Sequence, residues 1–320
     1  MHKIYIDGSV GTTGLQIVER LQGRRDLQLL EIEESKRKDF GARLSMISQA
    51  DVAILCLPDE ASREIAAAAD KAGIETVIID ASSAHRTSEG WVYGMPELSP
   101  QQREAIRTAK RITNPGCHAS GFIAVVAPLV KAGILSADFP AVCLSVTGYS
   151  GGGKAMIAEY EAADRPVEFS SPRQYALKQG HKHLPEMTKW SGLNSPPVFC
   201  PVIGDFEKGM IVSVPLHANQ LNGSYTRADI HKILVEHYVG RDDLGTPSNS
   251  YIHILPLDSD DIIAANALAG RDDMLISVDG NDERIVLNAR FDNLGKGASG
   301  AAVQCLGIVM GGECETRNAK

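Results

Sequence analysis

The sequence predicts an α/β protein, with a doubly wound parallel sheet in a first domain and a mixed or antiparallel sheet in a second, α+β domain. Three observations carry this prediction. Strand and helix patterns alternate in the first third of the chain, a glycine-rich turn separates the first strand from the first helix, and the later strands follow without regular helices between them. The length of 320 residues also suits two domains.

The first domain is expected to begin with a short strand and to continue as a βαβ alternation. The run 51–57 (DVAILCL) is almost wholly apolar, which is typical of a strand buried on both faces, and Pro58 ends it. The expected strands are 4–6, 27–32, 51–57 and 76–79, and the expected helices are 13–21 and 60–72. Such βαβ units predict a parallel sheet with helices on both faces.

The second half of the chain starts with a helix and then becomes rich in strands. The expected helices are 119–132, ending at Gly133, and 298–310 near the end of the chain. The expected strands are 141–147, 198–202, 210–216, 251–255, 275–279 and 284–288. Strands without regular intervening helices predict a mixed or antiparallel sheet.

Charge and composition exclude several classes of protein. The net charge of −8 argues against a non-specific nucleic-acid binder, which needs a basic surface. No apolar run reaches the roughly 20 residues that span a bilayer, and the N-terminus has the pattern of a strand rather than of a signal peptide. We therefore expect a cytoplasmic protein that acts on a small molecule.

The cysteines are scattered without a C-x-x-C pair, which argues against a zinc site and against a disulfide framework. They are Cys56, Cys117, Cys143, Cys200, Cys305 and Cys314. Three of them, Cys56, Cys143 and Cys305, lie in apolar patterns and are expected to be buried apolar residues.

Cys117 differs because it stands between a loop and an apolar helix. The sequence 114–117 (NPGC) places its thiol at a helix N-terminus, where the helix dipole favours the thiolate. The backbone N–H groups at such a terminus can also hold an oxyanion. We therefore interpret Cys117 as a catalytic nucleophile.

A pair of histidines is the candidate for acid/base catalysis. His181 and His183 share a face if their backbone is extended, and Pro185 suits the first turn of a following helix. Histidine exchanges protons near neutral pH, so either imidazole can act on the thiol or on a substrate oxygen. The spacing also fits two metal ligands, but no third ligand stands out, and we assign no metal. His118 follows the cysteine on the helix and need not reach the thiol.

The glycine-rich turn is the candidate cofactor site. Gly8, Gly11 and Gly14, with Thr12 and Thr13 between the last two, lie between the first strand and the first helix. Glycines let backbone N–H groups approach a pyrophosphate, whose charge the helix N-terminus favours. The gap between the first two glycines departs from strict G-x-G-x-x-G, but the position favours dinucleotide binding.

The end of the second strand gives a mixed signal about the nicotinamide cofactor. A carboxylate such as Glu33 would hold the 2′-hydroxyl of NAD, whereas basic residues accommodate the 2′-phosphate of NADP. Ser35, Lys36, Arg37 and Lys38 favour NADP. We expect NADPH, with Ser35, Lys36 and Arg37 among its contacts.

Two further segments are candidates for binding an anionic substrate. Arg86 follows the strand that closes at Asp80, and ligands bind at the carboxyl ends of parallel strands. Its guanidinium can clamp a phosphate or a carboxylate. Ser150, Gly151 and Lys154 follow another strand and offer backbone donors and one cation.

These motifs together resemble the N-acetyl-γ-glutamyl-phosphate reductases of arginine biosynthesis, in particular their shorter type. The matching stretches are 7–15 (DGSVGTTGL), 80–86 (DASSAHR), 93–97 (YGMPE), 114–117 (NPGC), 148–154 (GYSGGGK), 180–187 (GHKHLPEM) and 292–304 (DNLGKGASGAAVQ). They occur in the family's order, and NPGC with HKHLPE is the specific pair. The chain departs from the family at His118, where tyrosine is most common.

The resemblance implies a Rossmann domain for residues 1–116 with 295–320, and an α+β domain for catalysis and oligomer contacts at 117–294. It implies NADPH as the cofactor and a homo-oligomer, either a dimer or a tetramer. It also implies that the last helix returns to the first domain.

The resemblance assigns roles to particular residues. Cys117 is the nucleophile, and His183 with His181 serves acid/base catalysis or substrate binding. Asn293 borders the cofactor, together with Gly295 and Gly297. We place Asn114, which begins the NPGC motif, among the substrate contacts.

The expected reaction is the NADPH-dependent reduction of an acyl phosphate through a thioester on Cys117. Two alternatives share this chemistry, an aspartate-semialdehyde dehydrogenase and a reductase of a carrier-bound aminoadipate phosphate. An alternative of another class is an NADP-binding sensor with a redox-active cysteine. The histidine pair and the anion-binding segments argue against a sensor, which needs neither.

Overall fold

The computed structural model describes residues 1–238 and 251–311. Of the six cysteines, Cys314 lies outside the described residues. The chain divides into two compact units, each of which has its own sheet. The first unit comprises Met1–Pro115 and the described residues from Ala298 onward, and the second comprises Gly116–Gly297.

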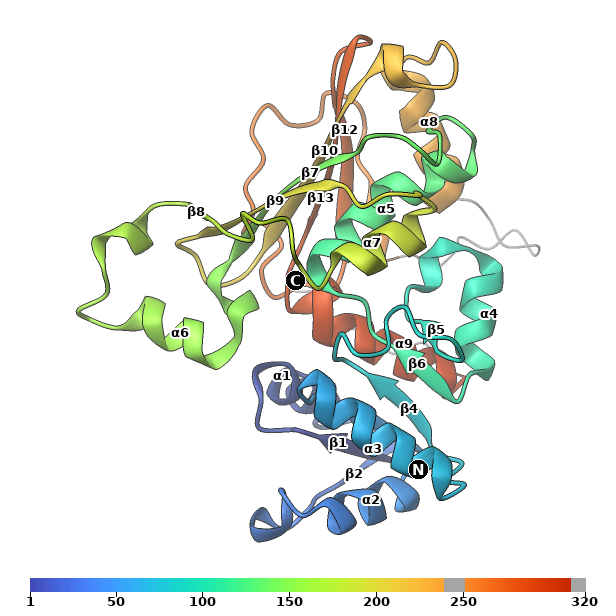
Figure 1. Ribbon diagram of the computed structural model, residues 1–320, viewed down its shortest axis with the longest axis vertical. Coiled ribbons are helices and arrows are strands. Elements are labelled where there is room, and N and C mark those ends of the chain that lie inside the picture. Colours follow the sequence, from blue (N-terminus) through green and yellow to red (C-terminus); the bar gives the residue numbers. More distant parts are fainter. Residues whose placement is uncertain (239–250, 312–320) are drawn as a thin grey trace. The chain divides into compact units, whose positions relative to one another are not determined.

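The first unit is built on a parallel sheet, as the sequence predicts (Figure 1). Its strand order is β2-β1-β3-β4-β6-β5, and every neighbouring pair is parallel. The strands are β1 (His2–Asp7), β2 (Leu27–Leu30), β3 (Val52–Leu55), β4 (Val77–Asp80), β5 (Val92–Tyr93) and β6 (Arg111–Thr113). The sheet therefore presents the carboxyl ends of its strands at one edge, where nucleotides bind in folds of this class.

Helices cover both faces of this sheet, because side chains alternate along a buried strand. The helices are α1 (Thr12–Leu21), α2 (Phe40–Gln49), α3 (Asp59–Lys71), α4 (Pro100–Thr108) and α9 (Gly300–Val309). On β1, Ile4 and Ile6 pack with α1, α4 and α9, whereas Tyr5 between them packs with α2 and α3. The sheet is therefore doubly wound, and the last helix packs in the same core as the first.

Two of these helices, α2 and α4, were not expected from the sequence, because neither has a strong apolar pattern. Their starts carry ordinary capping signals. Asp39 accepts a hydrogen bond from the Ala42 N–H at the start of α2, and Ser99 accepts one from the Gln102 N–H at the start of α4. Pro100 is the first residue of α4, the position that proline favours.

The second unit contains a mixed sheet of order β11-β12-β13-β10-β7-β9-β8. The pairs β7–β9 and β11–β12 are parallel, and the other pairs are antiparallel, which confirms the predicted mixed sheet. The strands are β7 (Val142–Gly148), β8 (Arg173–Gln174), β9 (Val198–Gly204), β10 (Met210–His217), β11 (Ile252–Ile254), β12 (Met274–Gly280) and β13 (Arg284–Phe291).

The helices of the second unit are α5 (Cys117–Lys131), α6 (Gly153–Glu161), α7 (Leu184–Ser191) and α8 (Arg227–Tyr238). The helices α5 and α8 pack against the sheet and α7 packs against α5, whereas the segment that carries α6 extends away from the sheet (Figure 1). The expectation that no regular helix separates the later strands was wrong, since α8 lies between β10 and β11, whereas α7 begins where Pro185 predicts a helical turn. The helix α8 mixes apolar with charged residues, which weakens its periodicity.

The helix α5 approaches the sheet closely through Gly121. A Cβ atom at Gly121 would lie 2.7 Å from a methyl carbon of Val212 and 2.8 Å from the ring of Phe291. This contact fixes the depth of α5 against β10 and β13, and with it the position of the first residue of the helix, Cys117.

Among the described residues, no helix is both long and apolar enough to cross a membrane.

Candidate active site

Cys117 is the first residue of α5, at the helix N-terminus that the sequence predicts. The residue before it, Gly116, is the N-cap and offers no side chain to the first N–H groups of the helix. The thiol is partly exposed. A Cβ atom at Gly297 would lie 2.8 Å from the Cys117 Cβ atom, so the chain at Gly297 lies directly against the cysteine. Only glycine fits there without displacing it.

The other cysteines of the apolar patterns differ from Cys117. Cys143 and Cys305 are fully buried, as expected, whereas Cys56 is only partly buried at its surface. Desolvation of the Cys56 thiol, with smaller effects of the charges of Asp80 and Asp7, raises its pKa to about 12. Burial also raises the pKa of Cys143. Cys56 and Cys143 therefore stay protonated and are poor nucleophiles.

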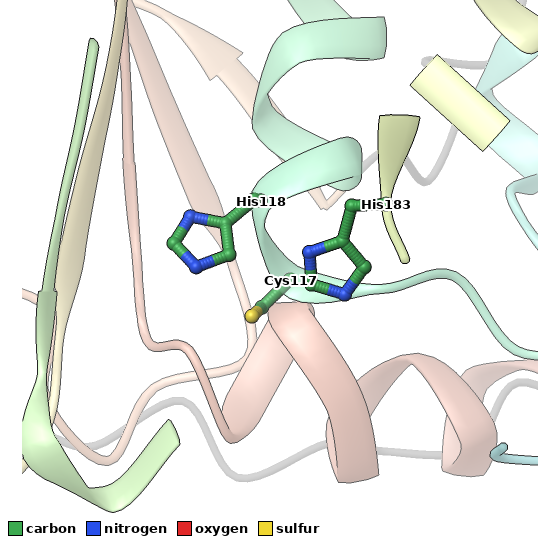
Figure 2. A group of neighbouring side chains, drawn as sticks. All are labelled: Cys117, His118 and His183. Atoms are coloured by element: carbon green, nitrogen blue, oxygen red, sulfur yellow. The ribbon is translucent and has the colours of Figure 1, made fainter. Parts of the chain in front are cut away.

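Two imidazoles lie beside the Cys117 thiol. One potential ligand atom from each of Cys117, His118 and His183 lies within 4.8 Å of the other two, and Figure 2 shows the three side chains converging. His183 was a predicted member of the site. His118 was set aside because it follows the cysteine on the helix, yet its side chain reaches the same place.

The two histidines of the H-x-H motif lie close together, but not for the expected reason. Their ring centroids are 4.8 Å apart. The backbone is not extended, since His183 has helical dihedral angles (φ −83°, ψ −17°) and the Leu184 N–H donates to the His181 carbonyl at 3.1 Å. A turn that leads into α7, with Pro185 in the first helical turn, brings the two rings together.

His118 is held between two hydroxyl groups. Its Nδ1 atom lies 2.6 Å from the Ser145 Oγ atom, and its Nε2 atom lies 2.8 Å from the Tyr175 hydroxyl. Burial, with smaller effects of the charges of His181 and Lys182, lowers the pKa of His118 to about 3. His118 is therefore neutral at physiological pH.

Tyr175 closes the same side of the site. Burial raises its pKa, and the charge of Cys117 adds to this effect, so the hydroxyl stays protonated. On this side, the neighbours of the Cys117 thiol are therefore neutral, hydrogen-bonded groups. Tyr175 and Ser145 had no signal in the sequence, because neither lies in a recognisable motif.

Glu186 lies between His183 and the start of α5. It is buried, and its Oε2 atom accepts a hydrogen bond from the Gly116 N–H at 3.1 Å. Its Oε1 atom lies 3.9 Å from His183 Nε2. The side chains of Cys117, His183 and Glu186 therefore lie near one another, with His183 between the other two in this sequence of contacts. Glu186 was not expected in the site, although its position three residues after His183 was a usable signal.

The glycine-rich turn of the first unit fits a dinucleotide. Gly8 has a positive φ of +83°, and a Cβ atom there would lie 2.3 Å from the Cys56 carbonyl oxygen. A Cβ atom at Gly14 would lie 2.3 Å from the Gly8 carbonyl oxygen. At Gly11 the only close atom among the described residues is that same oxygen, at 3.3 Å, so the turn is open there.

The N-terminus of α1 supports the same interpretation. Its N-cap, Gly11, has no side chain to bond the first N–H groups, and Thr12 and Thr13 begin the helix. Backbone donors at a helix N-terminus hold a pyrophosphate well. The residues present therefore fit the cofactor that the glycines predict.

The predicted contacts of the 2′-phosphate lie on the surface of the first unit. Lys36 forms an ion pair with Glu33 at 3.0 Å, and Arg37 forms one with Glu34 at 3.6 Å. Ser35 lies in the same short 3-10 helix as Glu34 and Lys36. Exposed ion pairs contribute little to stability. Lys36 and Arg37 can therefore each leave their glutamate and bind a phosphate instead.

Arg86 and Asn114 are bonded to each other at the carboxyl edge of the first sheet. Arg86 is buried and donates through Nε to the Asn114 carbonyl at 3.1 Å. Asn114 donates through Nδ2 to the Ala298 carbonyl at 2.9 Å, while its Oδ1 atom is buried without a hydrogen-bond partner among the described residues. This side-chain oxygen is an acceptor that a ligand can use.

The loop that carries Arg86 is anchored at Asp80. Burial works to raise the pKa of Asp80, but hydrogen bonds from His85, Ser82 and Ser62 outweigh it and lower the pKa. His85 Nδ1 lies 2.7 Å from the Asp80 carboxylate. The ionised carboxylate therefore fixes the loop in place.

In the second unit, Ser150 and Asn293 bond to each other. The Asn293 Nδ2 atom donates to Ser150 Oγ at 3.0 Å, and its Oδ1 atom accepts from the Gly209 N–H at 2.9 Å. Gly151 and Lys154 are exposed, and Lys154 lies in the first turn of α6. The serine and asparagine side chains thus support this loop, while Gly151 and Lys154 are accessible to a ligand.

Comparison with known proteins agrees with this arrangement. The family model described as "Semialdehyde dehydrogenase, NAD binding domain" matches residues 3–109, and the one described as "Semialdehyde dehydrogenase, dimerisation domain" matches residues 117–293. An N-acetyl-gamma-glutamyl-phosphate reductase 2 of Nostoc is 43% identical over 321 residues, covering 97% of each chain. An N-acetyl-gamma-glutamyl-phosphate reductase of Sinorhizobium medicae is 45% identical and covers 96% of this chain and 98% of its own.

Solved structures show the same fold at lower sequence identity. Aspartate semialdehyde dehydrogenase II of Vibrio cholerae, complexed with ASA, superposes with a TM-score of 0.71 at 19% identity, over 97% of this chain and 98% of its own. The enzyme from Francisella tularensis gives 0.71 at 15% identity, over 97% and 100%. The family models and the curated relatives show that the chain belongs to the semialdehyde dehydrogenase family, among its N-acetyl-gamma-glutamyl-phosphate reductases.

Proposed function

We propose that this chain reduces N-acetyl-γ-glutamyl phosphate to N-acetylglutamate 5-semialdehyde and phosphate, with NADPH, as a step of arginine biosynthesis. The observation that carries the proposal is Cys117 at the head of α5 with His183 beside it. The identity of 43–45% with curated reductases over nearly the whole chain supports this substrate. In this proposal residues 1–116 with 295–320 bind the cofactor, and residues 117–294 carry out catalysis.

The chain's own residues account for the covalent steps. The Cys117 thiolate attacks the acyl carbon, and the bond from that carbon to the phosphate oxygen breaks, which leaves a thioester. The uncapped N–H groups at the start of α5 stabilise the oxyanion. The turn from Gly8 to Gly14 would hold NADPH, which would supply the hydride needed to reduce the thioester.

In this scheme His183 is the general base and the general acid. It accepts the thiol proton before attack, and it returns a proton to the thiolate when the carbon–sulfur bond breaks and the aldehyde leaves. Glu186 keeps the imidazole in place through its position 3.9 Å from Nε2. His181 lies against His183 and contributes to substrate binding.

The test of the substrate is the reverse reaction, because it needs no labile acyl phosphate as a reagent. NADPH formation is followed with N-acetylglutamate semialdehyde plus phosphate, and then with aspartate semialdehyde plus phosphate. We expect kcat/KM to be at least about 100-fold higher with the acetylated substrate. A preference for aspartate semialdehyde would assign the chain to that activity instead, and no phosphate-dependent turnover with either would favour the sensor.

The cofactor contacts are tested by comparing NADPH with NADH under the same conditions. Lys36 and Arg37 favour the 2′-phosphate, so kcat/KM is expected to be higher with NADPH. Substituting both by glutamine should reduce that preference while turnover with NADH is retained. An unchanged preference would remove these residues from the cofactor site.

The second unit also offers a surface for assembly. Val142, Leu144 and Val198 are exposed on one face of the mixed sheet, and the matching family model is described as a dimerisation domain. We infer a homodimer through this face, in the cytoplasm, where a nucleophilic thiol stays reduced. Leu144→Lys should shift the molecule to a monomer in sedimentation velocity, and an unchanged assembly would place the contact elsewhere.

A further inference from the structure

The site around Cys117 contains one imidazole more than the proposed reaction uses. The reaction needs the sulfur and His183, whereas His118 adds a second imidazole whose ligand atom also lies within 4.8 Å of the other two. We propose that Cys117, His118 and His183 bind one Zn²⁺ ion, which reversibly blocks the nucleophile. Binding rests on the geometry alone, and only its inhibitory effect rests on the proposed function.

The donor set is one that zinc prefers. A thiolate with two imidazoles supplies three protein ligands and leaves a fourth position for water or an anion. Tetrahedral coordination at ordinary zinc bond lengths places neighbouring ligand atoms roughly 3.3–3.6 Å apart. The separations of up to 4.8 Å therefore need to close by about 1 Å, which rotation of the partly exposed Cys117 side chain and of the two rings can supply.

Each imidazole has a polar neighbour that orients it. His183 Nε2 lies 3.9 Å from the Glu186 carboxylate, and His118 Nδ1 lies 2.6 Å from the Ser145 hydroxyl. A hydrogen-bonded partner such as Ser145 fixes the ring orientation of a metal-binding histidine, and Glu186 places a carboxylate near the ring of His183. With Nδ1 held by Ser145, the ion would take His118 Nε2 in place of the Tyr175 hydroxyl, and Tyr175 would then bond to water.

The charges around the site also fit a dication. The Glu186 carboxylate offsets the nearby cation of Lys182, and the Cys117 thiolate supplies a negative charge to the ion. Both imidazoles bind the metal in their neutral form. As the sulfur–zinc bond forms, the thiol proton is released to solvent, so the cysteine is held as a metal-bound thiolate and cannot attack an acyl carbon.

The experiment measures metal binding directly on the full-length protein. Zinc chloride is titrated against a chromophoric zinc chelator, and Co²⁺ is used as a second probe because thiolate ligation gives it an intense near-ultraviolet band. We expect one ion per chain, and at least about a tenfold loss of affinity in His118→Phe and in Cys117→Ser. Cys200→Ser is the matched control, since Cys200 lies on β9 outside the cluster, and it should bind like the wild type.

A second variant is needed in case His118→Phe does not fold. His118→Tyr keeps a polar aromatic side chain but removes the ligand nitrogens, so it should also lose zinc affinity. Zinc binding that is unchanged in both His118 variants would overturn the site. Activity is measured separately with EDTA present. Turnover without zinc binding rejects the metal site alone, and zinc binding without turnover rejects the proposed function alone.

Discussion

The glycine-rich turn of the first unit and the cysteine–histidine cluster of the second are built in opposite ways. In the turn, backbone atoms lie close together, and a Cβ at Gly8 or Gly14 would lie 2.3 Å from a carbonyl oxygen. In the cluster, side chains from several elements meet around Cys117. A substitution that adds atoms should therefore disrupt the turn, whereas a substitution that removes a polar group should disrupt the cluster.

The sharpest test of the cluster is Cys117→Ser. A hydroxyl is far less ionised than a thiol at neutral pH, so we expect turnover to fall by about 1,000-fold or more. The cofactor turn is untouched, so NADPH should bind with unchanged affinity in a fluorescence titration. Cys200→Ser serves as the control and should keep its turnover. Turnover of Cys117→Ser within about threefold of the wild type would contradict the thioester route.

The turn is tested by Gly14→Ala. Its Cβ would lie 2.3 Å from the Gly8 carbonyl oxygen and 2.8 Å from the Ser9 Cα atom, so the backbone must shift. We expect a loss of about 1–3 kcal/mol in the free energy of unfolding and weaker NADPH binding. Urea unfolding and cofactor titration measure the two effects.

Gly41→Ala is the matched control in the same unit. Gly41 lies in α2, and its Cβ would meet only the Asp39 Oδ1 atom at 3.5 Å, an ordinary contact. Alanine favours a helix by up to about 1 kcal/mol over glycine, so this variant should be as stable as the wild type or more so. Equal effects of both alanines would show that the crowding at Gly14 is not what matters.

How far each region could be predicted from the sequence follows from the same contrast. The turn lies within one short segment, so its glycines and its place between strand and helix are visible together. Cys117 could be placed at a helix N-terminus because a loop with proline and glycine precedes its helix. Glu186 has a local signal in its position three residues after His183, but its hydrogen bond to Gly116, which lies 70 residues away, leaves no local pattern.

The errors have physical causes as well. Successive residues on a helix point about 100° apart, which is why His118 was not expected beside the thiol. Its ring is long enough to turn back toward Cys117, and Ser145 and Tyr175 hold it there. The H-x-H pair was expected to be extended, but the turn into α7 decides its geometry.

Glu186→Gln tests whether the carboxylate near His183 matters for the work of the cluster. Glutamine keeps the volume, but it removes the charge beside His183 Nε2. We expect kcat to fall about 10-fold with KM nearly unchanged, because the imidazole loses its orientation while the substrate keeps its contacts. The exposed Glu159→Gln is the control. A rise in KM without a fall in kcat would give Glu186 a role in substrate binding instead.

His118 also adds a pH dependence to stability. Burial lowers its pKa to about 3 in the folded protein, against an ordinary value near 6.5, so below that value the unfolded chain binds a proton that the folded chain does not. Stability is therefore unaffected by this group above about pH 6.5 and falls as the pH drops from there toward 3, by at most about 1.4 kcal/mol per pH unit. Urea unfolding of the wild type and of His118→Phe at about pH 7 and pH 5 measures the effect. The variant should lose less stability between these two pH values than the wild type does, and parallel losses would show that the buried ring is not the group that titrates.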